Sequence, residues 1–312
     1  MAFLSIIIPS YNEEENITRT ATRLREILTE ADIPYELIFI SDGSRDNTFA
    51  EIEKAAELDS NVKGYEFSRN FGKEAAIFAG LKMAKGNCAV VIDCDLQHPP
   101  EIIPEMYKLW KEGYDVVEGV KSERGEEGKL HKLFANAFYG IMSRLMKINM
   151  NDTSDYKLLD RKVVDVLLDL KESNTFFRAL SFWVGFQSTS ISYEVRERTA
   201  GESKWSFVSL LKYAVMNTTS FTTAPLQLVT FLGILSIALA VIMGLQTLVR
   251  YFIGNAVEGF TTVILLVLMI GGFIMISLGI IGHYLARIYD EVKGRPRYII
   301  ARETGKEEAK HE

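Results

Sequence analysis

The sequence predicts an α/β domain with a mostly parallel sheet, followed by an interfacial helix and two transmembrane helices. In the N-terminal part of this 312-residue chain, short apolar runs alternate with helical segments, and most of the apolar runs end in a polar loop. This alternation is typical of a parallel sheet covered by helices. Nearer the C-terminus, residues 213–249 and 259–286 contain no charged side chain. Both stretches exceed the roughly 20 residues that a membrane-spanning helix needs.

Apolar and β-branched residues define the expected strands, and turn-forming residues separate them from the helices. Strands are expected at residues 3–8, 35–40 and 62–67, in the run that ends at 93, and at 114–119 and 191–195. Helices are expected at residues 13–30, 48–58, 73–84, 101–111, 130–146, 162–170 and 206–221, the last in the membrane interface. Asn12 and Asp46 are the expected N-caps of the first two helices, because a short polar side chain can accept a hydrogen bond from a free amide there. The charged tail from residue 302 is expected to be disordered.

An acidic pair follows one of the apolar runs: residues 89–92 are apolar, and Asp93-Cys94-Asp95 comes directly after them. In open α/β sheets ligands bind outside the carboxyl ends of the strands, so this strand end is a candidate site. Alternate residues of a strand share a face, so Asp93 and Asp95 are expected to point the same way. A divalent cation would relieve the repulsion between the two carboxylates, and Gln97 offers a further oxygen ligand. The alternative is a strand end with two solvated acids.

Charge and cysteine content argue against several classes of function. The net charge is −6, which argues against nucleic acid as the main partner. The chain has no glycine-rich phosphate loop of the P-loop or dinucleotide-binding type, so a nucleotide would need another arrangement. Cys88 and Cys94 lie in or beside a strand that is expected to be buried, and they lack the spacing of a metal site. We expect no disulfide between them on the cytoplasmic side of a membrane.

The distribution of basic residues predicts the orientation of the two transmembrane helices. The connecting segment carries only Arg250, whereas several basic residues precede the first helix and follow the second. Since cytoplasmic flanks carry the excess of lysine and arginine, we expect a multi-pass protein of the inner (plasma) membrane with both termini in the cytoplasm. The expected parts are a cytoplasmic domain at 1–203, a juxtamembrane amphipathic helix at 204–223, a transmembrane hairpin at 224–287 and a cytoplasmic tail at 288–312. Two helices make a thin membrane domain, which self-association to a homo-oligomer would cover.

A basic segment lies directly before the membrane region and contains Arg196, Arg198, Ser203 and Lys204. A basic cluster beside a membrane is commonly attracted to anionic lipid. The same residues can hold a phosphate group, through the fork of an arginine and the point charge of a lysine. Spacing alone does not choose between these two interpretations.

Six short motifs occur in the order in which family 2 glycosyltransferases carry them. They are Pro9-Ser10-Tyr11-Asn12-Glu13, Ser41-Asp42-Gly43-Ser44-Arg45-Asp46, Ser68-Arg69-Asn70-Phe71-Gly72-Lys73, Asp93-Cys94-Asp95-Leu96-Gln97-His98-Pro99, Asp155-Tyr156-Lys157-Leu158 and the segment from Arg198 to Trp205. Together they resemble the polyprenyl-phosphate glycosyltransferases, the relatives of dolichol-phosphate mannose synthase, in the bacterial branch with two C-terminal membrane helices. The resemblance covers residues 4–297 and implies a Rossmann-like domain of the glycosyltransferase A type.

The resemblance also implies roles for individual residues. The nucleotide pocket would be lined by Pro9, Tyr11, Glu13 and Asp42. Mg²⁺ or Mn²⁺ would be bound against the donor diphosphate by Asp93, Asp95 and Gln97. Phosphate groups of the substrates would be received by Arg196, Arg198, Ser203 and Lys204. The catalytic residues would be Asp95 and Asp155, the latter at the position of the family's proposed base; the chain departs from the family at Ser41, where many relatives have a first aspartate.

By this resemblance, the protein would transfer glucose or an N-acetylhexosamine from a nucleoside diphosphate, UDP rather than GDP, to polyprenyl phosphate with inversion of configuration. The product would be a lipid-linked monosaccharide for cell-envelope glycosylation. The acceptor phosphate is mostly dianionic at pH 7, so Asp155 could orient a substrate group instead of acting as a base. A processive polysaccharide synthase would add a Gln-x-x-Arg-Trp motif and further membrane helices, which this chain lacks. A non-catalytic membrane scaffold would not need the acidic residues, and their presence favours an enzyme.

Overall fold

The computed structural model describes residues 3–121, 154–170, 172, 176–193, 224–253 and 259–305. The chain divides into two compact units, one made of residues 1–204 with 296–312 and the other of residues 205–295. The helices expected at 130–146 and 206–221 lie outside the described residues.

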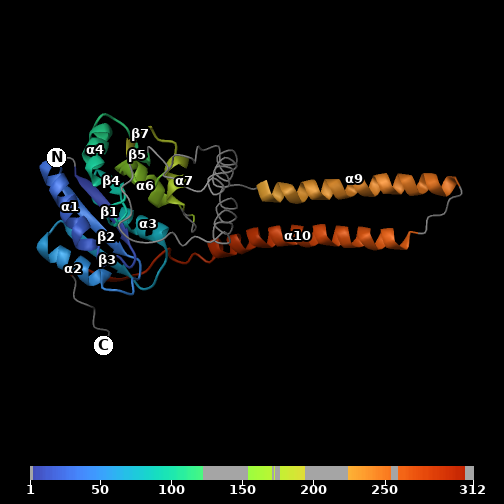
Figure 1. Cartoon of the computed structure of the whole chain (residues 1–312), viewed down its shortest axis with the longest axis horizontal. Helices are drawn as coiled ribbons and strands as arrows, with labels where there is room; N and C mark the ends of the chain where they lie inside the picture. The colour runs from blue at the N-terminus through green and yellow to red at the C-terminus, as the bar shows by residue number, and fades with distance from the viewer. Residues whose placement is uncertain are drawn as a thin grey trace. The chain divides into compact units, whose positions relative to one another are not determined.

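The first unit is built on a mixed sheet covered by helices (Figure 1). The sheet has eight strands in the order β7-β5-β6-β4-β1-β2-β3-β8. The strands are β1 (Leu4–Ser10), β2 (Tyr35–Ser41), β3 (Val62–Phe67), β4 (Cys88–Val91), β5 (Val116–Lys121), β6 (Lys157–Asp160), β7 (Ser188–Tyr193) and β8 (Ile300–Glu303). Within it, β1 pairs in parallel with β2 and β4, β2 pairs in parallel with β3, and β5 pairs in parallel with β7. The predicted α/β fold with a mostly parallel sheet is confirmed.

Helices connect the strands up to β5 in the predicted alternation, and two further helices follow the antiparallel strand β6. They are α1 (Ile17–Glu30), α2 (Thr48–Leu58), α3 (Lys73–Met83), the 3-10 helix η1 (Pro100–Ile102), α4 (Ile103–Lys111), α6 (Arg161–Asp169) and α7 (Phe177–Trp183). The N-cap of α2 is Asn47, one residue after the expected Asp46. The carboxylate of Asp46 nevertheless accepts a hydrogen bond from the amide of Thr48 at 3.1 Å, which satisfies one of the free amides at this helix end.

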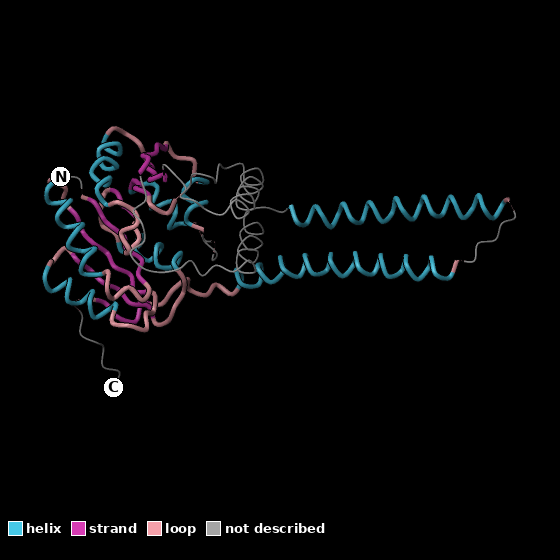
Figure 2. Tube along the Cα trace, in the orientation of Figure 1, coloured by secondary structure: helices cyan, strands magenta, loops and turns pink. Residues whose placement is uncertain are grey.

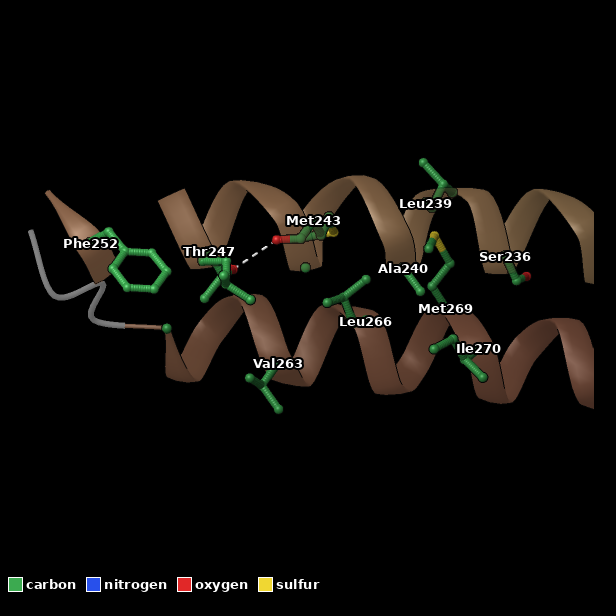
Figure 3. A pocket seen from close by; sticks show the side chains of 13 residues that line it. Ser236, Leu239, Ala240, Met243, Thr247, Phe252, Val263, Leu266, Met269 and Ile270 are labelled. Carbon is green, nitrogen blue, oxygen red and sulfur yellow. Dashed lines mark hydrogen bonds between the residues drawn. The ribbon is translucent and has the colours of Figure 1, made fainter. Parts of the chain in front are cut away.

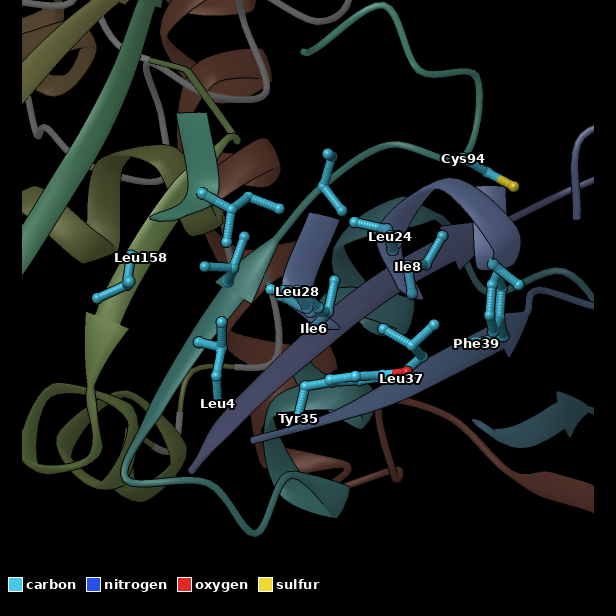
Figure 4. Packing of buried hydrophobic residues seen from close by; sticks show 14 of the residues in the cluster. Leu4, Ile6, Ile8, Leu24, Leu28, Tyr35, Leu37, Phe39, Cys94 and Leu158 are labelled. Carbon is cyan, nitrogen blue, oxygen red and sulfur yellow. The ribbon is translucent and has the colours of Figure 1, made fainter. Parts of the chain in front are cut away.

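The two faces of the parallel strands bury different parts of the core. Leu4, Ile6 and Ile8 of β1 point to the face that α1 covers, where they pack with buried residues of α1 and β2 (Figure 4). Ile7 points to the other face, against α3. A Cβ added to Gly80 of α3 would lie 2.3 Å from Ile7 Cγ2, so the absence of a side chain at this position allows the helix to approach the strand.

Two short antiparallel strands differ from the sequence prediction. Strand β6 lies between β4 and β5, and no strand is expected at its residues, 157–160. Strand β8 pairs with β3 at the edge of the sheet. Beside it, the Tyr298 ring stacks on Phe67 with centroids 5.0 Å apart, and Arg302 Nε lies 2.5 Å from Glu66 Oε2. The expectation of disorder is therefore wrong for residues 302–305, while 306–312 lie outside the described residues.

The second unit contains two long helices, α9 (Ala224–Phe252) and α10 (Phe260–Val292), which lie side by side (Figure 2). By length and composition both can cross a membrane, with candidate spans at Val229–Arg250 and Leu266–Val292. The hydroxyl of Ser236 donates to a carbonyl oxygen one turn earlier, at 2.8 Å. Such bonds satisfy polar groups that would find no water within a bilayer.

A groove of about 760 Å³ runs between α9 and α10 (Figure 3). Most of its lining is aliphatic, with Met243 and Met269 among the larger side chains. Thr247 also lines it, but the Thr247 hydroxyl is occupied by a hydrogen bond to the Met243 carbonyl at 2.8 Å. The groove therefore presents a mainly apolar surface.

Candidate active site

The carboxyl ends of the parallel strands lie at one edge of the sheet, and the loops that follow them carry most of the predicted site residues that the structure describes. Ser10, the last residue of β1, pairs with Ser41, the last residue of β2, so the loops after these strands start side by side. Strand β4 pairs with β1 on its other side and leads into the loop of Asp93 and Asp95. This is the edge at which open α/β sheets bind ligands.

The loops after β1 and β2 are joined through Asn12. The Asn12 amide donates to Ser44 Oγ at 3.1 Å, and the Asn12 side-chain oxygen accepts from the amide of Arg45 at 2.9 Å. Asn12 has a φ of 55°, a region that asparagine enters more readily than most residues. The predicted capping role of Asn12 is therefore wrong, because its side chain is used between the loops and α1 begins at Ile17 with Asn16 as the N-cap.

Asp42 is buried and ties the loop after β2 to the loop after β3. The two Asp42 carboxylate oxygens accept hydrogen bonds from the amides of Phe71 and Gly72, at 2.6 and 2.9 Å. Burial raises the pKa of Asp42, and these hydrogen bonds oppose that rise. At Gly43, where φ is 61°, an added Cβ would lie 2.3 Å from the carbonyl carbon of Arg69. The close approach of the two loops thus requires a glycine.

The other residues predicted for the nucleotide pocket differ in exposure. Pro9 is buried within β1, whereas the side chain of Tyr11 is exposed, with 42% of its surface accessible. Glu13 is half-buried. Burial, together with the negative charges of Asp95 and Asp93, raises the pKa of Glu13. Glu13 therefore lies within electrostatic reach of the acidic pair.

The acidic pair lies in the loop after β4, because the strand ends at Val91 rather than at the expected residue 93. Exposure still alternates as expected, since Asp93 and Asp95 are partly exposed and the cysteine between them is buried. The Asp93 Oδ1 atom lies 2.6 Å from Nζ of Lys73. The Asp95 Oδ1 atom accepts a hydrogen bond from the amide of Gln97 at 3.1 Å. The two carboxylates thus have different partners.

The chemistry of this loop fits a divalent cation that takes further ligands from a substrate. Within the described part of the chain, Asp95 has no cationic partner. In the same part of the chain, no three acidic, histidine or cysteine side chains are placed to enclose a metal ion. Mg²⁺ commonly takes one or two protein carboxylates and leaves positions for water and phosphate oxygens. A metal held by Asp95, Asp93 and Gln97 would depend on a diphosphate for its remaining ligands.

Asp155 lies in an ion-pair network. The guanidinium of Arg178 contacts both Asp155 carboxylate oxygens, and Nζ of Lys73 lies 3.1 Å from Asp155 Oδ2. Lys73 therefore bridges Asp93 and Asp155. Burial raises the pKa of Asp155, but Lys73 and Arg178 outweigh it and hold that pKa well below its usual range. The two carboxylates in turn outweigh the effect of burial on Lys73 and raise the pKa of the ammonium.

A carboxylate in this setting is a weak proton acceptor, because both of its oxygens are paired and its pKa is low. It is well suited to hold two cations at fixed positions. For Asp155, the geometry favours the positioning role over the role of a base; both remain predictions.

Three residues of this network have no role in the sequence prediction. Lys73 ends one of the family motifs, which is a signal that could have found it. Arg178 belongs to an aromatic segment, and nothing in its local sequence indicates a partner at Asp155. Glu74 accepts the amide of Phe177 at 2.8 Å, and burial together with the Asp155 charge raises the pKa of Glu74 to about 7.

Aromatic side chains pack against His98 of the acidic loop. The His98 ring stacks on Tyr156 with centroids 5.2 Å apart and meets Tyr193 edge-on at 5.8 Å. The hydroxyl of Tyr156 donates to the carbonyl oxygen of Pro99 at 2.9 Å, which fixes the loop further. Burial lowers the pKa of His98 against the opposing charge of Asp93, whose Oδ2 lies 3.8 Å from His98 Nδ1. The acidic loop therefore packs against the rings of Tyr156 and Tyr193.

The predicted phosphate-binding residues lie outside the described residues. They are Arg196, Arg198, Ser203 and Lys204. Their roles remain predictions.

Comparison with known proteins decides the family. Residues 5–168 match the family model described as "Glycosyl transferase family 2". The chain belongs to this family. It is 41% identical over 303 residues to YkcC, an uncharacterized glycosyltransferase of Bacillus subtilis (strain 168), across 96% of this chain and 94% of that protein. It is 37% identical over 300 residues to the SfII prophage-derived bactoprenol glucosyl transferase of Shigella flexneri, across 95% of this chain and 97% of the relative.

A solved structure shares the fold. Glucosyl-3-phosphoglycerate synthase from Mycobacterium tuberculosis, in complex with UDP, matches 70% of this chain and 79% of its own, with a TM-score of 0.50 and 17% identity. At this identity the likeness concerns the fold alone. Since bactoprenol is a polyprenol, the resemblance of this family 2 chain to the polyprenyl-phosphate glycosyltransferases is confirmed.

Proposed function

We propose that this family 2 glycosyltransferase moves a sugar from a UDP-sugar to polyprenyl phosphate at the cytoplasmic face of the inner membrane. The match to bactoprenol glucosyl transferases carries the proposal, because it spans 95% of this chain and 97% of the relative. It therefore extends beyond the family domain and includes both apolar helices. Glucose is the first candidate for the sugar, because these relatives are glucosyl transferases, and an N-acetylhexosamine is the second.

The donor would lie at the acidic edge of the sheet. Asp95, with Asp93 and Gln97, would hold Mg²⁺ or Mn²⁺ against the donor diphosphate. When bound, the metal would offset the negative charge that develops on the leaving diphosphate. The exposed ring of Tyr11 and the half-buried carboxylate of Glu13 border the same edge and would contact the nucleoside.

The acceptor would need positive charge more than it needs a base. A phosphate monoester with a second pKa near 6 is already mostly dianionic at pH 7, so it can attack the sugar directly. Attack from the face opposite the diphosphate inverts the configuration. Lys73 and Arg178 are the described cations on Asp155 and would lower the repulsion between the two anionic substrates. Arg198 and Lys204 would add to this charge from the segment before the membrane.

A donor screen tests the proposed reaction. Full-length protein in detergent would be given undecaprenyl phosphate, Mg²⁺ and one labelled donor at a time: UDP-glucose, UDP-N-acetylglucosamine or GDP-mannose, each with and without chelator. We expect chelator-sensitive transfer of label from a UDP-sugar into organic-extractable lipid. Label in polymer, or none from any of these donors, would contradict the proposal.

A matched pair of variants tests the acidic pair. Asp95→Ala should abolish transfer, because it removes the metal carboxylate that has no cationic partner in the described chain. Asp165→Ala removes an exposed aspartate of α6 and should leave transfer unchanged. Near-normal transfer by Asp95→Ala in the presence of metal would overturn the assignment of Asp95.

A further inference from the structure

We propose that the Lys73 ammonium is an internal counter-cation of the metal site. It neutralises Asp93 until the donor diphosphate binds, and it competes with the divalent ion for this carboxylate. This inference rests on the proposed function, because it takes Asp93 and Asp95 as the metal site. It adds that the site binds metal weakly by itself and tightly together with the donor.

The position of the Lys73 ammonium carries the first step. Its Nζ lies 2.6 Å from Asp93 Oδ1, in the space that a metal ligated by this oxygen would need. The same ammonium lies 3.1 Å from Asp155 Oδ2. The side chain of Lys73 is 42% exposed and that of Asp93 29% exposed, so the ion pair faces the open side of the site. An incoming ion can therefore reach the carboxylate that the ammonium now neutralises.

The backbone around Lys73 is fixed, so only its flexible side chain can move. Lys73 is the first residue of α3, and Gly72 is the N-cap with a φ of 99°. The amides of Phe71 and Gly72 are both held by the buried carboxylate of Asp42. A lysine stem with four rotatable carbons can still carry its ammonium between neighbouring acceptors.

Release of Lys73 leaves its second partner, Asp155, still paired. Arg178 contacts both oxygens of Asp155 by itself, at 3.1 and 2.9 Å. Asp93 in turn would exchange the ammonium for the metal. After the exchange, Asp93 and Asp155 would therefore both keep a positively charged partner.

The exchange also matches the charge that the substrates bring. Before the donor binds, Glu13, Asp93 and Asp95 place three carboxyl groups at one edge, and each of the two aspartates raises the pKa of Glu13. Lys73 offsets part of this charge. When a metal and a diphosphate enter together, the released ammonium stands beside new phosphate oxygens and can bind them as a point charge.

A Mn²⁺ titration tests the competition without measuring transfer. Full-length protein in detergent would be titrated with Mn²⁺, and the free ion followed by its electron paramagnetic resonance signal, without nucleotide and with UDP. Without nucleotide, Lys73→Met should bind Mn²⁺ about 1.5- to fivefold more tightly than the wild type, the range for loss of one partly exposed competing ion pair. Lys73→Arg, which keeps the charge, should bind Mn²⁺ like the wild type.

Control variants separate competition from a general change in charge. Lys54→Met removes an exposed lysine that pairs with Glu51 at 2.6 Å elsewhere in the domain, and it should leave Mn²⁺ affinity unchanged. If Lys73→Met does not fold by circular dichroism, Lys73→Gln removes the same charge with a polar side chain. Equal or weaker Mn²⁺ binding by the folded, uncharged variant would overturn the inference.

The titration also distinguishes this inference from the proposed function. If neither the wild type nor the uncharged variant binds Mn²⁺, with or without UDP, the metal site itself is wrong and the inference fails with it. If the uncharged variant binds Mn²⁺ more tightly but no sugar reaches lipid, the competition stands and the proposed acceptor or donor is wrong.

Discussion

Arg178 binds both carboxylate oxygens of Asp155, with Nε 3.1 Å from Oδ1 and Nη2 2.9 Å from Oδ2. Arg178 stands on α7, a helix of seven residues, whereas Asp155 lies just before β6. A bidentate pair fixes the orientation of the carboxylate as well as its position. Loss of the Arg178–Asp155 pair should therefore disturb the geometry of the site, in addition to removing one positive charge.

Arg178→Ala should lower the rate of sugar transfer about a hundredfold, the scale expected when a site group is displaced by about 1 Å. In this variant Asp155 keeps only Lys73, which cannot hold both oxygens in a plane. Initial rates with saturating donor and acceptor would measure the loss. Arg23→Ala removes an arginine of α1 that pairs with Glu26 and Glu101, and it should keep the wild-type rate. A rate above half of the wild type for Arg178→Ala would contradict a role in positioning.

Glu74 predicts a pH dependence of stability. Burial, with the Asp155 charge, raises the pKa of Glu74 from 4.5 to about 7, so between these values the folded protein holds a proton that the unfolded chain releases. The stabilisation is complete below pH 4.5 and is lost as the pH rises through about 7. The full effect is up to about 3 kcal/mol.

Glu74→Gln should remove this dependence, because glutamine cannot ionise but can still accept the amide of Phe177. The melting temperature of the variant relative to the wild type should therefore rise between pH 5 and pH 8, by about 5–10 °C. Circular dichroism of both full-length proteins in detergent would measure it. If the difference in melting temperature between Glu74→Gln and the wild type stays constant from pH 5 to pH 8, Glu74 does not take up a proton on folding.

The regular part of the fold could be predicted because its signals are local. Strands β1 and β2 are largely apolar runs of seven residues, β3 alternates buried and partly exposed residues over six, and each is followed by turn formers and a helix. Strand β6 has only four residues and starts at Lys157, which is buried between Glu118 Oε1 at 3.0 Å and Ser181 Oγ at 2.9 Å. A lysine at a strand start gives no local sign of burial. Its partners come from distant segments, and only the folded chain brings them together.

The candidate site also contains residues that local sequence signals could place and residues that they could not. Asp93, Asp95 and Asp42 could be placed at one sheet edge because each follows a parallel strand. The bridge from Asp93 through Lys73 to Asp155 could not be placed, because Asp155 lies 82 residues from Lys73 in the chain. Charge pairing over such a separation leaves no periodic pattern in a single sequence.

Gly43 is predicted to be irreplaceable for steric reasons. Gly43→Ala would put a Cβ 2.3 Å from the carbonyl carbon of Arg69 while φ stays at 61°, so the loops after β2 and β3 must separate. We expect a loss of about 3 kcal/mol in the free energy of unfolding and weaker donor binding. Gly113→Ala shares a positive φ, 111°, but its Cβ meets no atom within 4 Å, and it should cost about 1 kcal/mol. Equal losses in melting temperature for the two variants would show that strain, and not the contact with Arg69, explains Gly43.

The chain after α10 returns to the first unit and completes its sheet. The amide of Ser68 donates to the carbonyl oxygen of Ile299 at 3.0 Å. Thr304 and Gly64 exchange two hydrogen bonds of 2.9 Å, one from each amide. The guanidinium of Arg297 donates to the Leu170 carbonyl oxygen. This segment therefore covers the edge of β3 that would otherwise be left with unpaired amides.

Two truncations test how much this segment stabilises the cytoplasmic unit. Deletion of residues 297–312 removes β8 and the Arg297 hydrogen bond, with an expected loss of about 3 kcal/mol in the free energy of unfolding. For a domain of this size the melting temperature should fall by about 6–12 °C, measured by circular dichroism of the protein in detergent. Deletion of residues 306–312 keeps all of these contacts and should leave the melting temperature unchanged. If both truncated proteins melt at the same temperature as the wild type, the pairing of β8 with β3 does not contribute to the stability of the cytoplasmic unit.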